Sequence, residues 1–367
     1  MNKFCNLHFL FNYQMNNYIT NKILSTLLII QVLFIALISR KPDWVEKYYS
    51  NGVYPVISRL LRKLLGWIPI SIGDLLYILF ILIVLRWIWY LIQTWFSPIK
   101  SHIYKLGAFI SLVFFVFHLF WGLNYYRLPL HKRIGMESLE YTQTELVETA
   151  QIHIDKLNTI HSNIVENDSI AISVPYKRLD IYKIAGTHYK TLNIDSIDLH
   201  FKTKSIKSSL LSKTLSYMGF SGYLNPFTGE SQVNRKIPKS NFPATTCHEM
   251  AHQLGYASED EANYIGYLAC ITSEDAYFKY SGELLAVQHL LYTIAQNDKD
   301  LYKEYYQKLH VGIQKNIQQN RDFWDSYHNP FEPYFKKFYD LFLKANSQEE
   351  GIQSYNAMVG YLVNNKH

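Results

Sequence analysis

Three apolar runs in the first third of the chain constrain its fold more than any other feature. They cover about residues 23–39, 72–92 and 106–123. Each has about the length that a helix needs to cross the hydrocarbon core of a bilayer, and Trp and Tyr residues gather near the ends of the second and third runs. A buried core helix would explain one such run, but three runs predict three transmembrane helices in a lipid bilayer.

The first run could instead belong to a signal peptide, because Lys22 precedes it. However, no small-residue cleavage site follows, and Ser39-Arg40-Lys41 is typical of an anchor flank. We therefore expect a membrane region over residues 1–126 and one soluble domain over residues 127–367, which is long enough for a core of its own. The linker after the third run is short, so this domain should lie close to the membrane surface.

The run His248-Glu249-Met250-Ala251-His252 indicates a metal site in the soluble domain. Residues four apart lie on one face of a helix, so both imidazoles can turn a nitrogen toward one zinc ion. Glu249 is rotated by about 100° from His248 and would face a zinc-bound water. Zinc lowers the pKa of that water to roughly 7, and Glu249 would take its proton as general base.

A catalytic zinc needs a third protein ligand and an open position. Gly255 follows His252 by three residues, where a left-handed residue can end the helix and turn the chain back. Glu259 and Glu261 then compete for the third place, and we prefer Glu259. Glu259 with Asn263 resembles the ExxxD pattern of glutamate-type zincins, whose last residue orients a ligand histidine, although Asn departs from that pattern. Alternatively, both glutamates are helix N-terminal carboxylates favoured by the helix dipole.

Hydrophobic periodicity predicts that most of the soluble domain is helical. Helices are expected over residues 144–164, 274–297 and 299–319, with a further helix that resumes by Tyr334 after Asn329-Pro330. Residues 175–203 should contain short β-rich pieces, and residues 231–237 should form an exposed strand before the HEMAH helix. In zincins such a strand pairs with an extended peptide substrate. The alternative is an ordinary edge strand kept soluble by Arg235 and Lys236.

The charges beside the apolar runs do not agree on one orientation. The positive-inside rule, applied literally, places the HEMAH domain in the cytoplasm. However, residues 56–67 form an amphipathic stretch with Arg59, Arg62 and Lys63 on one face, which could lie in the interface without reporting orientation.

Composition and charge exclude several other classes. Net charge is +6 and is spread along the chain, and the soluble part carries no basic cluster interleaved with aromatics, so we expect no nucleic acid partner. Few ionisable groups lie in the apolar runs, which argues against a transporter or channel. Cys247 precedes a ligand histidine, but a small buried residue is the preferred interpretation over a nucleophile.

Several stretches resemble the DUF3810 family of bacterial membrane proteins. They are WGLNYYR at 121–127, NPFTGE at 225–230, TTCHEMAHQLG at 245–255 and EDEANYIGYLAC at 259–270. The resemblance implies a mainly helical α+β zincin-like metallopeptidase domain behind the three transmembrane helices. It also implies a multi-pass protein of the bacterial inner membrane and favours a catalytic domain outside the cytoplasm.

Zincin catalysis also needs a hydrogen-bond donor for the oxyanion of the tetrahedral intermediate. Tyr280, Tyr355, Arg235 and His289 are candidates by residue type. We prefer Tyr355, because GIQSY at 351–355 resembles a recurring stretch of the family.

The sequence thus predicts a membrane-anchored zinc metallopeptidase with Glu249 and Tyr355 as catalytic residues and His248, His252 and Glu259 as metal ligands. Its substrate would be a peptide or membrane protein. The alternative is a non-catalytic membrane-bound binding or scaffold protein on the same fold.

Overall fold

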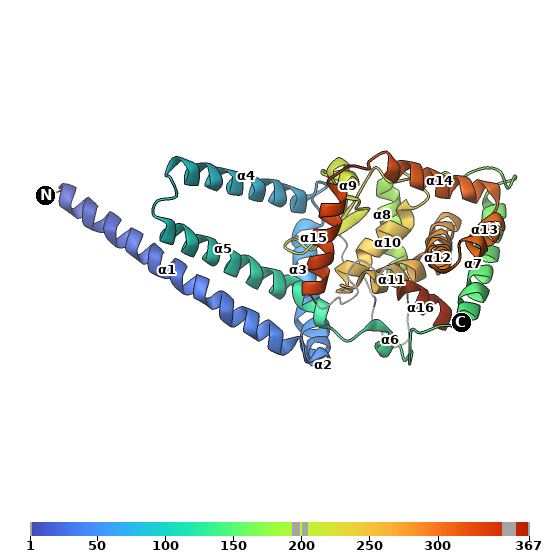
Figure 1. The fold of residues 1–367 in the computed structure, drawn as a ribbon, viewed down its shortest axis with the longest axis horizontal. Helices are drawn as coiled ribbons and strands as arrows, with labels where there is room; N and C mark the ends of the chain where they lie inside the picture. Colours follow the sequence, from blue (N-terminus) through green and yellow to red (C-terminus); the bar gives the residue numbers. More distant parts are fainter. Residues whose placement is uncertain (1, 193–198, 200–204, 347–356, 366–367) are drawn as a thin grey trace.

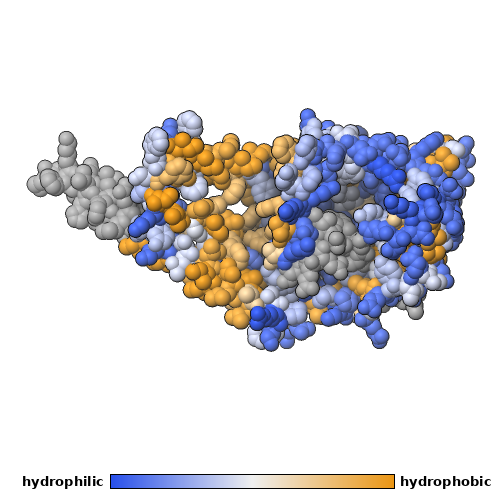
Figure 2. Space-filling model, viewed as in Figure 1, coloured by the Kyte–Doolittle hydropathy of each residue, from blue (hydrophilic) through white to orange (hydrophobic). Residues whose placement is uncertain are grey.

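The computed structural model describes residues 2–192, 199, 205–346 and 357–365, and this part of the chain is mostly helical. Three of its helices are long and apolar enough to cross a membrane, at Tyr18–Ile38, Ile72–Gln93 and Ile99–Phe120. The three apolar runs are therefore confirmed as candidate spans, with shifted bounds. The spans lie at one side of the molecule, and apolar residues gather over them (Figures 1 and 2).

The first third of the chain also forms short helices between the spans. Its elements are α1 (Asn2–Ile38), α2 (Pro42–Trp44), the π-helix η1 (Val45–Val53), α3 (Tyr54–Leu65), α4 (Ile72–Gln93), α5 (Ile99–Phe120) and the 3-10 helix η2 (Gly122–Tyr126). Helices α1 and α5 pack closely where Gly107 faces Ser25. A Cβ at Gly107 would lie only 2.1 Å from the Ser25 hydroxyl, so the approach requires glycine. Helix α4 meets α5 through aromatic pairs such as Phe80 with Phe109.

The rest of the chain packs helices and one small sheet around a common core. Its elements are α6 (Leu130–Arg133), α7 (Gln143–Ile164), α8 (Arg178–Thr191), β1 (Ile206–Ser208), α9 (Ser212–Met218), β2 (Gly222–Asn225), β3 (Glu230–Val233), α10 (Phe242–Gln253), α11 (Glu259–Ile271), α12 (Ala276–Asn297), α13 (Lys299–Gln307), α14 (Val311–Asp325), α15 (Glu332–Ala345) and α16 (Ala357–Asn364). Helices α7 and α12 confirm two predicted helices. The predicted helix over 299–319 is divided into α13 and α14.

The sheet corrects the prediction for residues 231–237. Its strand order is β1-β3-β2, with β3 parallel to β1 and antiparallel to β2. Strand β3 is therefore central and buried, and it ends at Val233. The prediction of an exposed strand was wrong because the polar side chains of Ser231 and Gln232 make hydrogen bonds inside the protein. The Ser231 hydroxyl donates to Glu249 O, and the Gln232 amide donates to Glu230.

Residues 178–191 form a helix, so the β-rich prediction for 175–203 was wrong over this part. Ile181, Ala185 and Tyr189 are fully buried at four-residue spacing, which gives α8 one continuous core-facing side. Most of the remaining stretch, including Ile197 and Phe201, whose alternation with Leu199 is typical of a strand, lies outside the described residues.

Helix α3 turns its polar side toward the protein. Tyr54, Ser58 and Arg62 all donate hydrogen bonds to the carbonyl oxygen of Gln253 at the end of α10, over 2.9, 3.2 and 3.2 Å. The amphipathic stretch is thus a helix, but Arg62 is buried in a polar contact. At other positions of α3, the apolar side chains of Val56, Leu60 and Leu64 are exposed.

Helix α15 has the same character. It exposes the apolar side chains Tyr334, Phe338 and Leu341, which share one face. Helices α3 and α15 both run across the direction of the spans, at the junction between the spans and the rest of the molecule (Figure 1). Amphipathic helices that lie in the plane of a bilayer surface have this arrangement.

The segment between the first two spans also packs into the C-terminal part of the molecule. Glu46 of η1 accepts two hydrogen bonds from Arg127, each over 2.9 Å, and pairs with Arg133 over 2.8 Å. Arg127 in turn donates to Gly255 O over 2.8 Å, directly after the HEMAH helix. Burial raises the pKa of Glu46, but the hydrogen bonds and charges of the two arginines outweigh it, so its pKa is lowered.

Replacing Glu46 by Gln should lower the free energy of unfolding of the detergent-solubilised protein at pH 7 by about 3 kcal/mol, because it leaves buried arginine charge unpaired. The melting temperature Tm should fall accordingly. A carboxyl with a lowered folded-state pKa stabilises the fold above its unfolded pKa of about 4.3, and this contribution is lost as the pH falls through the folded pKa. The difference in Tm between wild type and Glu46→Gln should therefore shrink below about pH 4. Glu148→Gln, at an exposed position of α7, is the control. A Tm difference that stays constant across this range would contradict the assignment.

Candidate metal centre

The turn after α10 carries the metal-ligand candidates toward one another. Helix α10 ends at Gln253, and Gly255 has a φ of +88°, which confirms the predicted left-handed turn. A Cβ at Gly255 would lie 2.9 Å from the Tyr54 ring and 3.0 Å from Asn124 Oδ1. Both the backbone conformation and the close packing therefore require glycine, and the next helix can begin at Glu259 beside the two histidines.

The structure brings His248, His252 and Glu259 together in a buried cluster. The Nε2 atoms of the two histidines lie 3.1 Å apart, and Glu259 Oε2 lies 3.3 Å from His248 Nε2 and 3.8 Å from His252 Nε2. Ligand atoms at tetrahedral zinc, with bonds of about 2.0–2.1 Å, are about 3.3 Å apart. These three atoms can therefore occupy three corners of a zinc site.

Glu261, the competing third ligand, faces elsewhere. Its Oε1 accepts a hydrogen bond from the backbone N–H of Leu130 over 2.6 Å. Burial and neighbouring Asp260 raise the pKa of Glu261 to about 7. Of the two glutamates, the structure therefore places Glu259 at the histidines and uses Glu261 to hold α6.

A backbone carbonyl orients His252 for this role. His252 Nδ1 lies 2.6 Å from Tyr256 O, and because a carbonyl only accepts, Nδ1 carries the proton and Nε2 is left for the ion. Burial lowers the pKa of His252, but Glu259 and Glu249 outweigh it and raise the pKa to about 9. The cluster thus favours positive charge, and a divalent cation would displace the proton.

Asn263 does not take the orienting role that the ExxxN pattern suggested. Its Nδ2 and the Nδ1 of His248 are both buried, and neither has a hydrogen-bond partner in the described part of the chain. The orienting bond that the structure does show comes from the Tyr256 backbone.

Glu249 lies beside the cluster and is almost fully buried. A Cβ at Gly222 of β2 would lie only 2.3 Å from Glu249 Oε1, so the carboxyl fits because residue 222 is glycine. Burial raises the pKa of Glu249 to about 7, although His248 and His252 act in the opposite direction. A carboxyl with such a pKa can both accept and release a proton near neutral pH.

Two aromatic residues at the centre were missed from the sequence. The Tyr339 hydroxyl of α15 donates to Glu259 Oε1 over 2.6 Å. The Trp121 ring, just after α5, meets the His252 ring edge to face with centroids 6.1 Å apart. Tyr339 lies in an ordinary apolar pattern that no local signal marks. Trp121 opens the WGLNYYR stretch, but nothing in that stretch points to a contact with His252.

The predicted oxyanion donors have different outcomes. Tyr355, the preferred one, lies outside the described residues. The Tyr280 hydroxyl is buried in the core and donates to Asn316 Oδ1 over 2.8 Å. The backbone N–H of Arg235 donates a hydrogen bond to the Ser212 hydroxyl. His289 lies half-buried on α12.

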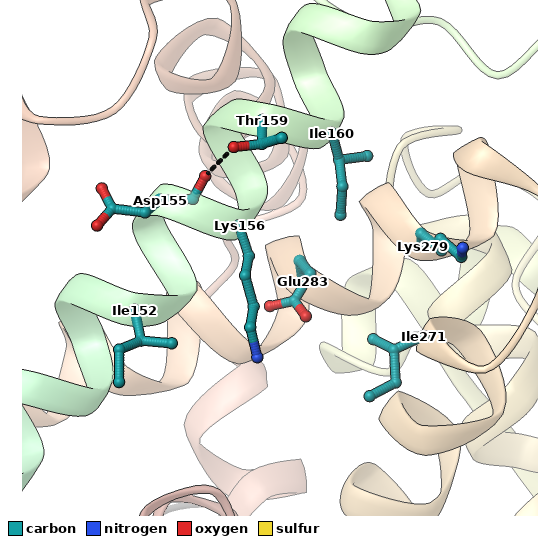
Figure 3. Close-up of a pocket in the computed structure, with 8 residues that line it drawn as sticks. All are labelled: Ile152, Asp155, Lys156, Thr159, Ile160, Ile271, Lys279 and Glu283. Carbon is teal, nitrogen blue, oxygen red and sulfur yellow. Dashed lines mark hydrogen bonds between the residues drawn. The ribbon is translucent and has the colours of Figure 1, made fainter. Parts of the chain in front are cut away.

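A hollow of about 550 Å³ lies against α7, α11 and α12 (Figure 3). Lys156 and Glu283 point into it from opposite helices. Its lining residues are Ile152, Asp155, Lys156, Thr159, Ile160, Ile271, Lys279 and Glu283. The lining includes no member of the histidine cluster, so we do not assign this hollow to the metal centre.

Residues 49–363 match one protein family, described as protein of unknown function (DUF3810). Comparisons with curated proteins and with solved structures found no match.

Replacing His248 by Ala should remove about one zinc per chain from the full-length protein in detergent, because the remaining donors no longer complete a three-ligand site. Metal analysis after dialysis against dilute zinc measures this loss. His328→Ala is the matched control, since His328 is largely exposed. Equal zinc content in wild type and His248→Ala would rule out this centre.

Proposed function

The chain belongs to the DUF3810 family, and we propose that this member is a membrane-anchored zinc metallopeptidase. The observation that carries the proposal is the buried triad of His248, His252 and Glu259 with the Glu249 carboxyl beside it. His248, His252 and Glu259 would hold the zinc, which would supply Lewis acidity toward the attacking water and the substrate carbonyl.

In this mechanism the protein moves the proton through Glu249. Its carboxylate accepts the proton of the attacking water and later passes it to the leaving amine. Tyr339 supports the neighbouring ligand, because its hydrogen bond occupies Glu259 Oε1 and leaves Oε2 for the ion. Such partners of metal ligands tune both affinity and orientation.

We further propose a zincin-like arrangement around α10 and α11, with β2 in the role that the sequence gave to residues 231–237. Strand β2 lies at the edge of the described sheet, and its Gly222 contacts the Glu249 carboxyl. An extended peptide added beside β2 would bring its main chain toward the proposed general base.

The substrate we propose is a membrane protein or a peptide at the membrane surface. Helix α3 contacts the end of α10 and α15 contacts Glu259, and both helices expose apolar side chains at other positions. Phe342 of α15 packs against Phe117 near the end of α5. This arrangement supports a centre that lies at the level where the spans leave the bilayer. We place the protein in the bacterial inner membrane with its catalytic domain outside the cytoplasm.

Replacing Glu249 by Gln should keep zinc and lower peptide cleavage by at least about a hundredfold, because Gln fills the same space but cannot take a proton. Cleavage is measured on a peptide library by mass spectrometry, with zinc content determined on the same samples. Glu148→Gln serves as the control. If Glu249→Gln cleaves as fast as wild type, the mechanism is wrong; if the zinc-loaded wild type cleaves nothing, a scaffold role is favoured.

Replacing Gly222 by Ala should displace the Glu249 carboxyl, since the added methyl would overlap Oε1. We expect cleavage to fall by more than about tenfold while zinc content stays unchanged. Gly52→Ala is the control, because the nearest atom to its added Cβ is 3.5 Å away. Unchanged cleavage by Gly222→Ala would show that Glu249 does not act from its observed position.

A further inference from the structure

We propose a second metal site, formed by His161, Asp168 and His310, that binds a divalent transition metal such as zinc. The three residues come from the end of α7, the loop after it and the residue before α14. In Figure 1, α7 and α14 lie away from the spans. The site shares no residue with the HEMAH centre and does not depend on the proposed peptidase activity.

The donor atoms are spaced as a tetrahedral ion requires. The Nδ1 atoms of His161 and His310 lie 3.3 Å apart, and His310 Nδ1 lies 3.3 Å from Asp168 Oδ1. Zinc ligands at bond lengths of about 2.0–2.1 Å lie about 3.3 Å apart at tetrahedral corners. All three donor atoms fall within 4.8 Å of one another.

His161 presents the correct nitrogen for a ligand. Its side chain is fully buried, and its Nε2 lies 3.0 Å from Ile170 O. The carbonyl can only accept, so Nε2 carries the proton and the unprotonated Nδ1 faces His310 and Asp168. A backbone carbonyl that fixes the tautomer of a ligand histidine is a recurring feature of metal sites.

The backbone around the site is held in place by its own hydrogen bonds. Asn158 of α7 accepts from the N–H of His310 over 3.0 Å and donates to Lys308 O over 2.9 Å. The N–H of Gly312 donates to Asp168 O over 2.7 Å. These contacts fix the three ligand-bearing segments relative to one another, which is the preorganisation that a metal site needs.

Gly312 shows how closely the segments approach. A Cβ at this position would lie 2.2 Å from Ile170 O and 2.6 Å from His161 Nε2. Only glycine therefore allows the start of α14 to reach the His161 ring. The Ser162 hydroxyl donates to Asp168 Oδ1 over 3.2 Å and orients the carboxylate.

The site is open to solvent at Asp168. Its three protein ligands leave one position for water, and Asp168 is exposed, so an ion can enter from solvent. A bound ion would tie the end of α7 to the start of α14.

The test uses full-length His248→Ala protein in detergent, so that the HEMAH centre is disabled. After removal of metal with a chelator, added zinc should bind at about one ion per chain and raise the Tm, because a ligand that binds the folded state stabilises it. In His248→Ala/His310→Ala both effects should disappear. His248→Ala/His328→Ala is the matched control and should behave as His248→Ala does.

Asp168→Asn in the same His248→Ala background tests whether the loss in the His310→Ala variant comes only from misfolding. It preserves the shape and the acceptor for Ser162 but removes the charge, so zinc affinity should fall by at least about tenfold. The proposal is overturned if zinc binds and stabilises the His310→Ala variant equally. It is also overturned if the folded His248→Ala protein binds no zinc, in which case the residues form only a hydrogen-bonded cluster. If His248→Ala binds as much zinc as wild type but His310→Ala loses it, this site stands and the proposed peptidase centre fails.

Discussion

The carbonyl oxygen of Gln253 is the contact on which the geometry of the candidate metal centre depends. The last carbonyls of a helix have no partners within the helix and carry the negative end of its dipole. At the end of α10 this oxygen receives donors from Tyr54, Ser58 and the Arg62 guanidinium. Three donors on one atom fix the end of the helix that carries His252, and all three come from α3, which lies between two candidate spans.

Contacts from the N-terminal third of the chain also fix the turn after α10. Gly255 packs against Tyr54, and its carbonyl binds Arg127, whose charge is balanced by Glu46. The proposed ligand Glu259 begins the next helix, so its position is set by this turn. The proposed ligand set is therefore held from the side of the candidate spans, by segments that precede and follow the third of them.

Those parts of the centre that depend on local geometry could be predicted from the sequence. The spacing of His248 and His252 and the left-handed turn at Gly255 involve only a few consecutive residues, so helix geometry alone is sufficient. The choice between Glu259 and Glu261 could not be made in this way, since both lie in the first turn of one helix. A distant contact, the Leu130 N–H at Glu261, separates them.

The incorrect predictions for residues 231–237 and for α8 also arise from contacts between residues distant in sequence. Ser231 and Gln232 suggested an exposed strand, but their polar atoms bind partners that only the folded sheet provides. The residues of α8 have strand-forming side chains, yet core packing selects the helix, because a helix aligns Ile181, Ala185 and Tyr189 on one side. Tyr339 reaches Glu259 across 80 positions of sequence, beyond any local pattern.

The hydrogen bond from Tyr339 links the centre to the surroundings of the molecule. Tyr339 sits on α15, a helix whose opposite residues Tyr334 and Phe338 are exposed and apolar. If that face rests on lipid, the packing of headgroups and acyl chains determines where α15 lies, and hence how firmly one carboxylate oxygen is held. The affinity of the proposed centre for an ion would then depend on both the polypeptide and the bilayer.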